Sequence, residues 1–534
     1  MTQRRFVLCL GLLVLAALAA QIGLFSAGLY RITSDESARI LTAWNLSWSN
    51  ALEPFLWPPF YKLFVGGAMK LFPSIFFTPR VLVEITGLLC LLALAWLATE
   101  LFGDRRIALI TAFLALLAPQ RLIFSVVPLS DIYYFAMVTA SAAATARWLR
   151  TDRAGPLLLG CGFLLLAETV RFESGLFAVF LEVLLLYRGL IARTLPWRTL
   201  VAASFILFAF PPLWGLNSLI WYGTLRNLSV AAQQFTGEFG RNTFYAIKWS
   251  PLRFFIQDML WNPLTFAGLV AVAWLSLRER TIRTWTLLFG VPLVVFSLVC
   301  IITFSIPTAA TWRTSGVWTL LMMPFDALIA LRIGQFLWRA GGMARVAAPI
   351  LLVLAILPMG VRSAWYARDG LHNNSTHHLH QERALDTWLD KRLAADPSAV
   401  AVIDSSTNLD YLDLLAFSRF PSRLITTGAG DPVRIGFYEP MAAAYAGDPK
   451  VQGFLTDRFG LDHGGAQAAL RAHHVRYLVV RNPVFLAALG SSPLVSRLHR
   501  FNDWTIYGVR PVPPPPGTRS GTASRALTRI PRAG

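Results

Sequence analysis

The sequence has few charged residues for its length, and this shortage limits what the protein can be. Only 14% of its 534 residues are Asp, Glu, Lys or Arg, whereas 55% are hydrophobic. This composition is too apolar for a soluble protein, and the mean hydropathy of +0.53 agrees. The apolar residues gather in runs long enough to cross about 30 Å of hydrocarbon. We therefore predict an integral membrane protein.

Cysteine and known ligand motifs are also scarce. The chain has four cysteines, and all lie inside apolar runs, where thiols are usually inert small side chains. The histidines around 372–380 have no second ligand cluster at structural-zinc spacing, so we predict no metal site. The sequence contains no P-loop, no Gly-rich dinucleotide motif and no nucleophile elbow. We therefore predict no cofactor and no nucleotide-driven pump.

The basic residues are explained by membrane topology. A net charge of +19 in a soluble domain would suggest nucleic acid as a partner. Here the arginines cluster in short loops between apolar runs, so we predict membrane lipids and no nucleic acid as partners.

Apolar runs predict about eleven transmembrane helices. The first follows Arg4 and Arg5, and its apolar character continues to Leu29, which favours a retained helix over a cleaved signal peptide. The other ten are expected near 80–102, 107–127, 131–149, 156–170, 172–190, 199–221, 261–277, 284–306, 316–336 and 345–361.

Arginine-rich loops then fall on one side of the membrane. The loops at 103–106, 147–153, 188–198, 278–283 and 332–345 share the side of Arg4 and Arg5. By the positive-inside rule this side is the cytoplasm, and the membrane that we expect is a bacterial inner membrane. Segments 30–79 and 222–260, and everything after about 362, are then extracytoplasmic.

The C-terminal part changes in composition. Short strand-like runs at 399–403 and 475–480 alternate with helix-like stretches at 382–393 and 466–472. We predict a transmembrane domain at 1–361 with a first outer loop at 30–79, a soluble extracytoplasmic α/β domain at 370–512, and a disordered basic tail at 513–534.

Two adjacent carboxylates, Asp35 and Glu36, stand where the first helix should emerge into water. One interpretation is a helix cap, in which Ser34 or Asp35 caps a helix that begins at Glu36. The other is a general base beside a second carboxylate. The two interpretations are compatible, because a cap holds a carboxylate in place.

Further polar residues are expected on the same outer side. Asp131 either caps a helix or faces an internal cavity. Arg171 and Glu173 form an interfacial ion pair in a hairpin, or offer a guanidinium to a phosphate. Arg313 is a second candidate for a phosphate contact, or it anchors the chain at the headgroups. We expect Trp57, and Tyr61 of the short amphipathic segment 60–64, to lie at the interface and contact substrate.

These motifs, taken in order, carry a resemblance to a known family. The motifs are Ser-Asp-Glu-Ser-Ala-Arg at 34–39, Trp-Pro-Pro-Phe-Tyr at 57–61, Leu-Phe-Gly-Asp-Arg-Arg at 101–106, and Arg-Phe-Glu-Ser-Gly at 171–175. Over about the first 190 residues the chain resembles GT-C membrane glycosyltransferases, and looks most like the branch with protein O-mannosyltransferases and aminoarabinose transferases.

This resemblance implies a function. It implies transfer of a sugar from a polyprenyl-phosphate donor to an acceptor (lipid, glycan or protein) on the extracytoplasmic face. Asp35 would be the general base and Glu36 its support. Asp131 would line the cavity, and Arg171 and Arg313 are our candidates for stabilising the leaving phosphate. Many members have His or Lys immediately before the two prolines, where this chain has Trp57. That change removes a phosphate or metal contact at this position, so Trp57 either stacks on substrate or anchors at the interface.

Two other functions compete with a glycosyltransferase. One is a transporter of lipid-linked sugars, although the charges gather at one face and no inverted repeat is visible. The other is a non-catalytic membrane scaffold of the same fold.

Overall fold

The computed structural model describes residues 1–32, 35–53, 57–224, 256–257, 259–303, 312–376, 379–404, 411–426, 474–490, 492 and 495–510. The chain forms two compact units. The first comprises Met1–Thr387 and Leu412–Arg419, and the second comprises Trp388–Tyr411 and Phe420–Gly534. The predicted basic tail at 513–534 and the predicted helix at 466–472 lie outside the described residues.

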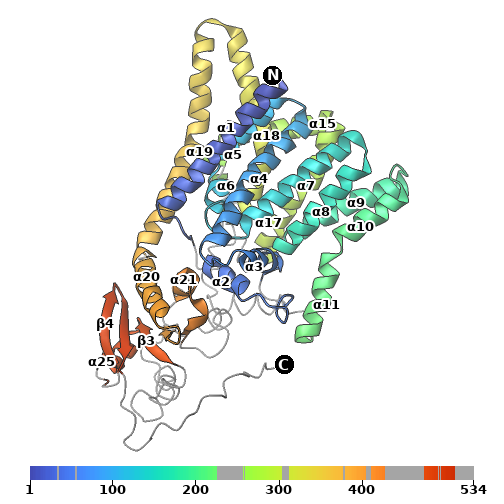
Figure 1. Ribbon diagram of the computed structural model, residues 1–534. Coiled ribbons are helices and arrows are strands. Elements are labelled where there is room, and N and C mark those ends of the chain that lie inside the picture. The colour runs from blue at the N-terminus through green and yellow to red at the C-terminus, as the bar shows by residue number, and fades with distance from the viewer. Residues whose placement is uncertain are drawn as a thin grey trace, which may run out of the picture. The chain divides into compact units, whose positions relative to one another are not determined.

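The first unit is helical (Figure 1). Its first nine helices in chain order are α1 (Gln3–Ser26), α2 (Asp35–Trp44), α3 (Phe60–Leu71), α4 (Phe77–Phe102), α5 (Arg105–Leu117), α6 (Pro119–Phe124), α7 (Asp131–Thr151), α8 (Ala154–Val170) and α9 (Ser174–Leu186). The π-helix η1 (Tyr187–Ile191) follows, and then α10 (Trp197–Leu207), α11 (Phe210–Tyr222), α15 (Leu264–Arg278), α16 (Arg280–Phe289), α17 (Val291–Thr303), α18 (Trp312–Ala340) and α19 (Gly342–Thr376).

Seven helical stretches within the described residues are long and apolar enough to cross a membrane. They are Gln3–Ser26, Phe77–Phe102, Ser174–Ile191, Trp197–Trp221, Arg280–Val299, Gly316–Ala340 and Gly342–His372. The chain is therefore a multi-pass membrane protein, as predicted from its composition. The predicted total of eleven transmembrane helices, the side on which each loop lies, and the domain limits at 361 and 370 stay predictions.

Several expected helices are interrupted at proline. The helix predicted at 107–127 divides into α5 and α6 because Pro119 has no amide hydrogen and stands at the start of the new helix. Pro211 and Pro212 likewise lie at the start of α11, so the helix predicted at 199–221 divides into two. Apolar periodicity predicts where helices run, and proline decides where they divide.

The centre of the bundle is built from small side chains. α4, α7 and α8 pack side by side. Residues 138–146 of α7 are all buried, and most of them are Ala, Ser or Thr. Ser141 donates a hydrogen bond to the carbonyl of Gly160 at 2.9 Å, and a Cβ on Gly160 would lie 2.9 Å from Thr145 Oγ1. Small residues of this kind let neighbouring helix backbones approach closely inside a membrane.

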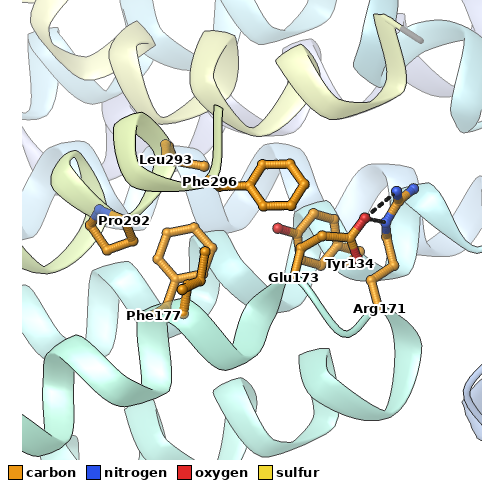
Figure 2. Close-up of a pocket in the computed structure, with 8 residues that line it drawn as sticks. Tyr134, Arg171, Glu173, Phe177, Pro292, Leu293 and Phe296 are labelled. Carbon is orange, nitrogen blue, oxygen red and sulfur yellow. Dashed lines mark hydrogen bonds and ion pairs between the residues drawn. The ribbon is translucent and has the colours of Figure 1, made fainter. Parts of the chain in front are cut away.

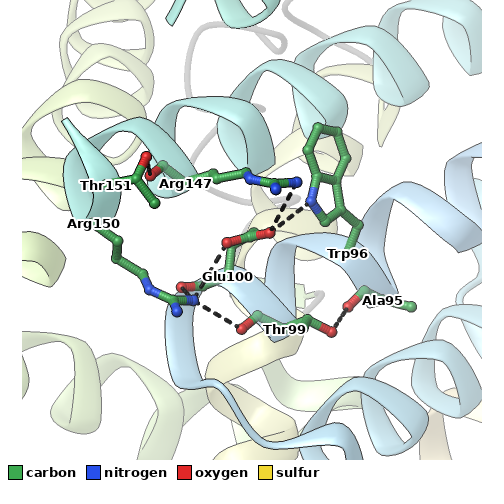
Figure 3. Close-up of polar contacts among 7 residues, drawn as sticks. All are labelled: Ala95, Trp96, Thr99, Glu100, Arg147, Arg150 and Thr151. Atoms are coloured by element: carbon green, nitrogen blue, oxygen red, sulfur yellow. Dashed lines mark hydrogen bonds and ion pairs between the residues drawn. The ribbon is translucent and has the colours of Figure 1, made fainter. Parts of the chain in front are cut away.

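Ion pairs join the ends of α4 and α7 (Figure 3). Glu100 accepts a hydrogen bond from Trp96 Nε1 at 3.0 Å and lies 3.3 Å from Arg150 Nη1 and 4.0 Å from Arg147 Nη1. Arg80 lies near the other end of α4, about 30 Å from Glu100 at the usual helical rise. Charged groups therefore stand at both ends of a helix that matches one hydrocarbon thickness.

Within the described residues, the second unit contains a mixed five-stranded sheet, so the predicted C-terminal α/β domain is confirmed in type. Its strands are β1 (Val400–Ile403), β2 (Leu424–Thr426), β3 (Val475–Val480), β4 (Val495–Phe501) and β5 (Trp504–Val509). The strand order is β2-β1-β3-β5-β4. β1 is parallel to β2 and β3, and β5 is antiparallel to β3 and β4.

In the part of the chain that the structure describes, four helical elements accompany these strands. α20 (Leu379–Ala395) passes from the first unit into the second, and α21 (Tyr411–Phe417) lies between β1 and β2 in sequence. The 3₁₀ turn η3 (Pro421–Arg423) precedes β2, and α25 (Pro483–Gly490) follows β3.

Candidate functional site

The two adjacent carboxylates lie in the first turn of α2, which begins at Asp35. Acidic side chains are favourable there because the first backbone amides of a helix carry partial positive charge. Glu36 is buried, and its Oε1 accepts a hydrogen bond from the Ile32 amide at 2.8 Å. The Asp35 side chain is half-buried. Glu36 therefore holds the entry to the helix, and Asp35 keeps partial access to solvent.

α3 packs closely against α2. A Cβ on Gly66 of α3 would lie 2.5 Å from the carbonyl oxygen of Ala43 in α2, so only glycine fits at this approach. Before α3, the Trp57 ring faces the Arg39 guanidinium of α2, at 4.3 Å from the ring centroid. The described part of the first loop is therefore a packed pair of helices (Figure 1).

Tyr61 of α3 joins this loop to the segment before α7. Its hydroxyl donates to the Pro128 carbonyl at 2.8 Å, and its ring meets that of Tyr133 edge-on at 6.2 Å. Burial raises the pKa of Tyr61, while the charges of Arg39 and Arg80 act to lower it. The hydroxyl is thus a neutral hydrogen-bond donor within reach of the charges near α2.

Asp131, Arg171 and Glu173 form one ionic group. Asp131 begins α7, and the other two lie in the bend between α8 and α9. Arg171 Nη1 is 2.5 Å from Asp131 Oδ1, and Arg171 Nη2 is 2.6 Å from Glu173 Oε1. Burial acts to raise the pKa of Glu173, but the Arg171 guanidinium holds this pKa below its usual range. One cation thus lies between two carboxylates.

A pocket opens beside this ionic group (Figure 2). Its polar lining residues are Tyr134, Arg171 and Glu173. The others are apolar and come from α9 and α17, namely Leu176, Phe177, Pro292, Leu293 and Phe296. The Arg171 guanidinium also lies 5.6 Å from the centroid of the Tyr134 ring. The pocket is therefore charged on one side and apolar on the other.

The structure connects most of the residues that the sequence indicated. Trp57 contacts Arg39 of α2, and Tyr61 contacts Pro128, three positions before Asp131. Asp131 in turn pairs with Arg171, which also pairs with Glu173. Arg313 lies in α18, but its side chain is outside the described residues. Among the described residues, no group of three or more His, Cys, Asp or Glu side chains is placed to hold a metal ion.

Arg80 belongs to the same region, and sequence analysis gave it no role. It is buried at the start of α4, donates to the carbonyls of Phe76 and Tyr30 at 2.6 and 3.3 Å, and lies 4.0 Å above the Phe76 ring. Its signal in the sequence was an arginine directly after Pro79 at the expected start of a membrane helix. An arginine at this position is typical of a residue that anchors a helix at the membrane surface, and it does not predict the contacts of Arg80 with Phe76 and Tyr30.

By sequence, the chain matches no protein-family model and no curated protein. By structure, it is similar to the apo form of the Archaeoglobus fulgidus oligosaccharyltransferase, with 13% identity and a TM-score of 0.54 over 90% of this chain and 70% of that chain. It is also similar to ArnT from Cupriavidus metallidurans in the apo state, with 16% identity and a TM-score of 0.55 over 93% of this chain and 98% of that chain.

A third similar structure is AglB from Archaeoglobus fulgidus in complex with an inhibitory peptide and a dolichol-phosphate. It has 13% identity and a TM-score of 0.52 over 89% of this chain and 69% of that chain. These neighbours are GT-C membrane glycosyltransferases. The chain therefore has the GT-C fold, and the resemblance seen in its motifs is confirmed at the level of the fold.

Proposed function

We propose that the protein is an integral membrane glycosyltransferase that moves a sugar from a polyprenyl-phosphate donor to an acceptor on the extracytoplasmic face. The placement of Asp35 carries this proposal. Its half-buried carboxylate stands at the start of α2, and the buried Glu36 beside it holds the turn. The GT-C fold and the dolichol-phosphate bound to the AglB neighbour support a donor of this lipid-phosphate class.

In the proposed reaction, Asp35 takes a proton from the acceptor as the acceptor attacks the anomeric carbon of the sugar. A bond forms between the acceptor and this carbon, and the bond from the carbon to the phosphate oxygen breaks. The lipid phosphate leaves with the electron pair of the broken bond. Glu36 supports the base by fixing the helix start. The proton stays on Asp35 until solvent removes it, so no further reactant is needed.

We also propose roles for the remaining predicted residues. We propose that Asp131, Arg171 and Glu173 line the substrate cavity as one ionic group, and that Tyr61 joins the first loop to Pro128 in the segment before Asp131. Trp57 faces Arg39, which favours a role as an anchor over a stacking contact with sugar. Arg313 remains our candidate for a contact with the leaving phosphate.

The proposed setting is a bacterial inner membrane, with the C-terminal domain on the extracytoplasmic side. The arginine-rich loops support this orientation, because Arg147 and Arg150 lie at the end of α7 opposite Asp131.

A transfer assay in proteoliposomes tests the function. Wild type and Asp35→Asn would receive radiolabelled polyprenyl-phosphate sugars, and release and transfer of the sugar would be followed. We expect donor-dependent transfer by wild type and a loss of about 10²-fold or more in the variant, since that is a common contribution of a general base.

Asp152→Asn is the matched control. Asp152 follows the end of α7 that is opposite to Asp131. It is exposed, and its φ of 51° is a backbone conformation that Asn tolerates. Its side chain lies 2.9 Å from Arg188 Nη1. This control should keep full activity. Unchanged transfer by Asp35→Asn would remove Asp35 from the mechanism. Accumulation of intact donor inside the vesicles would indicate a transporter, and no turnover with any donor would favour a scaffold.

A further inference from the structure

Except for its first residue, Tyr411, the helix α21 belongs to a different compact unit from the chain on either side of it. Residues 412–419 belong to the first unit, whereas the residues before and after them belong to the second. In sequence, α21 is the crossover between the parallel strands β1 and β2. The described residues of α21 are almost fully buried, with Tyr411, Leu412 and Leu414 each 0% exposed. This short helix therefore packs within the unit that contains α2.

One side chain of α21 holds the segment that carries Asp35. The Asp413 carboxylate forms an ion pair with Arg31 through Oδ2, and Oδ1 accepts a hydrogen bond from Ser37 Oγ at 2.5 Å. Arg31 precedes Asp35 by four positions, and Ser37 follows it by two. All three of these linked side chains are buried. Asp413 thus holds the chain on both sides of the proposed base.

Aromatic contacts fix the same helix at its other end. The Phe417 ring meets the ring of Phe76 at 5.6 Å and that of Tyr30 at 6.4 Å, in both cases edge-on. These three residues form a buried apolar cluster. The Arg80 guanidinium lies 5.7 Å from the Phe417 ring centroid. The position of Asp413 is therefore set by packing that does not involve Asp413 itself.

A buried carboxylate of this kind has a strong effect on its partners. When one member of a buried ion pair is removed, the other is left as an uncompensated charge and moves toward water. Loss of the Asp413 charge would release Arg31, and loss of its acceptor oxygen would release Ser37. The first turn of α2 would then be held by the Glu36 contact with Ile32 and by its packing against α3.

We propose that Asp413 is a positioning residue for the Asp35–Glu36 pair, and that the docking of α21 on the first loop brings the proposed base into its working geometry. This inference rests on the proposed function for its effect on catalysis, although the positioning itself can be measured without activity. Under this proposal the first loop needs Asp413, a residue from the C-terminal part of the chain, to reach its working arrangement.

The experiment compares full-length wild type with Asp413→Asn and Ser37→Ala in the same membranes, with Asp152→Asn as the control. Asp413→Asn keeps the size of the side chain but removes its charge, and Ser37→Ala removes one hydrogen bond while the ion pair stays. The readouts are kcat and KM for transfer, and amide hydrogen exchange of residues 35–44.

We expect Asp413→Asn to lower kcat by about tenfold or more, because small errors in the placement of a reacting group are costly, while KM for the donor changes little. Exchange of the 35–44 amides should rise by about tenfold, with no rise in α4 or α7. Ser37→Ala should change both readouts in the same direction, by about threefold. Asp152→Asn should match wild type.

Each remaining outcome decides the proposal. Unchanged exchange at 35–44 in both variants would overturn it. If Asp413→Asn raises exchange throughout the protein, that variant is unfolding, and Ser37→Ala decides: a rise confined to 35–44 supports the positioning role, and no rise overturns it. If wild type transfers no sugar, the proposed function fails, while a local rise in exchange still supports the positioning role of Asp413.

Discussion

The Arg171 guanidinium lies 2.5 Å from the Asp131 carboxylate, although 40 positions separate the two residues in the chain. Its second nitrogen lies 2.6 Å from Glu173. One positive charge is thus shared by two carboxylates beside the pocket. This arrangement fixes the planes of all three side chains, and it makes Arg171 important for stability whatever it contacts in a substrate.

Removal of Arg171 should destabilise the protein strongly. In Arg171→Gln the Asp131 carboxylate, which is 0% exposed, loses its cation inside the protein. We expect a loss of about 3–5 kcal/mol in the free energy of unfolding, measured by denaturant titration in detergent micelles. The double variant Asp131→Asn/Arg171→Gln leaves no charge at position 131 and should be more stable than the single variant. A double variant that is less stable than the single one would contradict this account.

Acidification should remove the stability that Glu173 contributes to this ionic group. The pKa of Glu173 is lower in the folded protein than in the unfolded chain, so its carboxylate stabilises the fold at pH values above about 4.3. That contribution is lost as the pH falls through the folded-state pKa. Melting temperatures measured between pH 3 and 7 should therefore fall below about pH 4 in wild type, and less steeply in Glu173→Gln. Identical slopes in the two proteins would show that Glu173 does not contribute.

Two neighbouring glycines of α3 should respond in opposite ways to alanine. In Gly66→Ala the new Cβ would lie 2.5 Å from the Ala43 carbonyl, so α3 must move away from α2. We expect a loss of about 1–3 kcal/mol in stability and reduced transfer. In Gly67→Ala the new Cβ meets nothing within 4 Å. This control should be neutral or more stable by up to about 1 kcal/mol, because alanine is the better helix former. Equal effects at both positions would argue against the close approach.

Local pattern was sufficient for much of the fold. The apolar run at 3–26 and the strand-like run at 475–480 form the expected helix and strand, because each is decided by hydrophobic periodicity within a few turns or residues. The short amphipathic segment that begins at Phe60 is a helix of 12 residues, α3. The start of α2 was predicted within one residue, since acidic side chains favour a helix N-terminus.

The contacts of the candidate site residues were less predictable from the sequence. An ion pair of Arg171 with Glu173, two positions away, was one of two interpretations of the sequence. The contact of Arg171 with Asp131 depends on how α7 meets the α8–α9 bend. Trp57 was a candidate for substrate contact, and its Arg39 partner comes from the packing of the loop against α2. Neither contact has a signature in the spacing of the residues.

The sequence by itself determined that this protein spans a membrane several times and that a sheet domain follows, and it offered a helix start at Asp35 and Glu36 as one interpretation. These properties depend on hydrophobic runs and on short-range capping, which act between neighbours in the chain. Only the tertiary structure decided that Asp413 reaches Arg31 across 382 positions. A buried carboxylate must find a cation and hydrogen-bond donors, but which ones it finds depends on packing between distant segments.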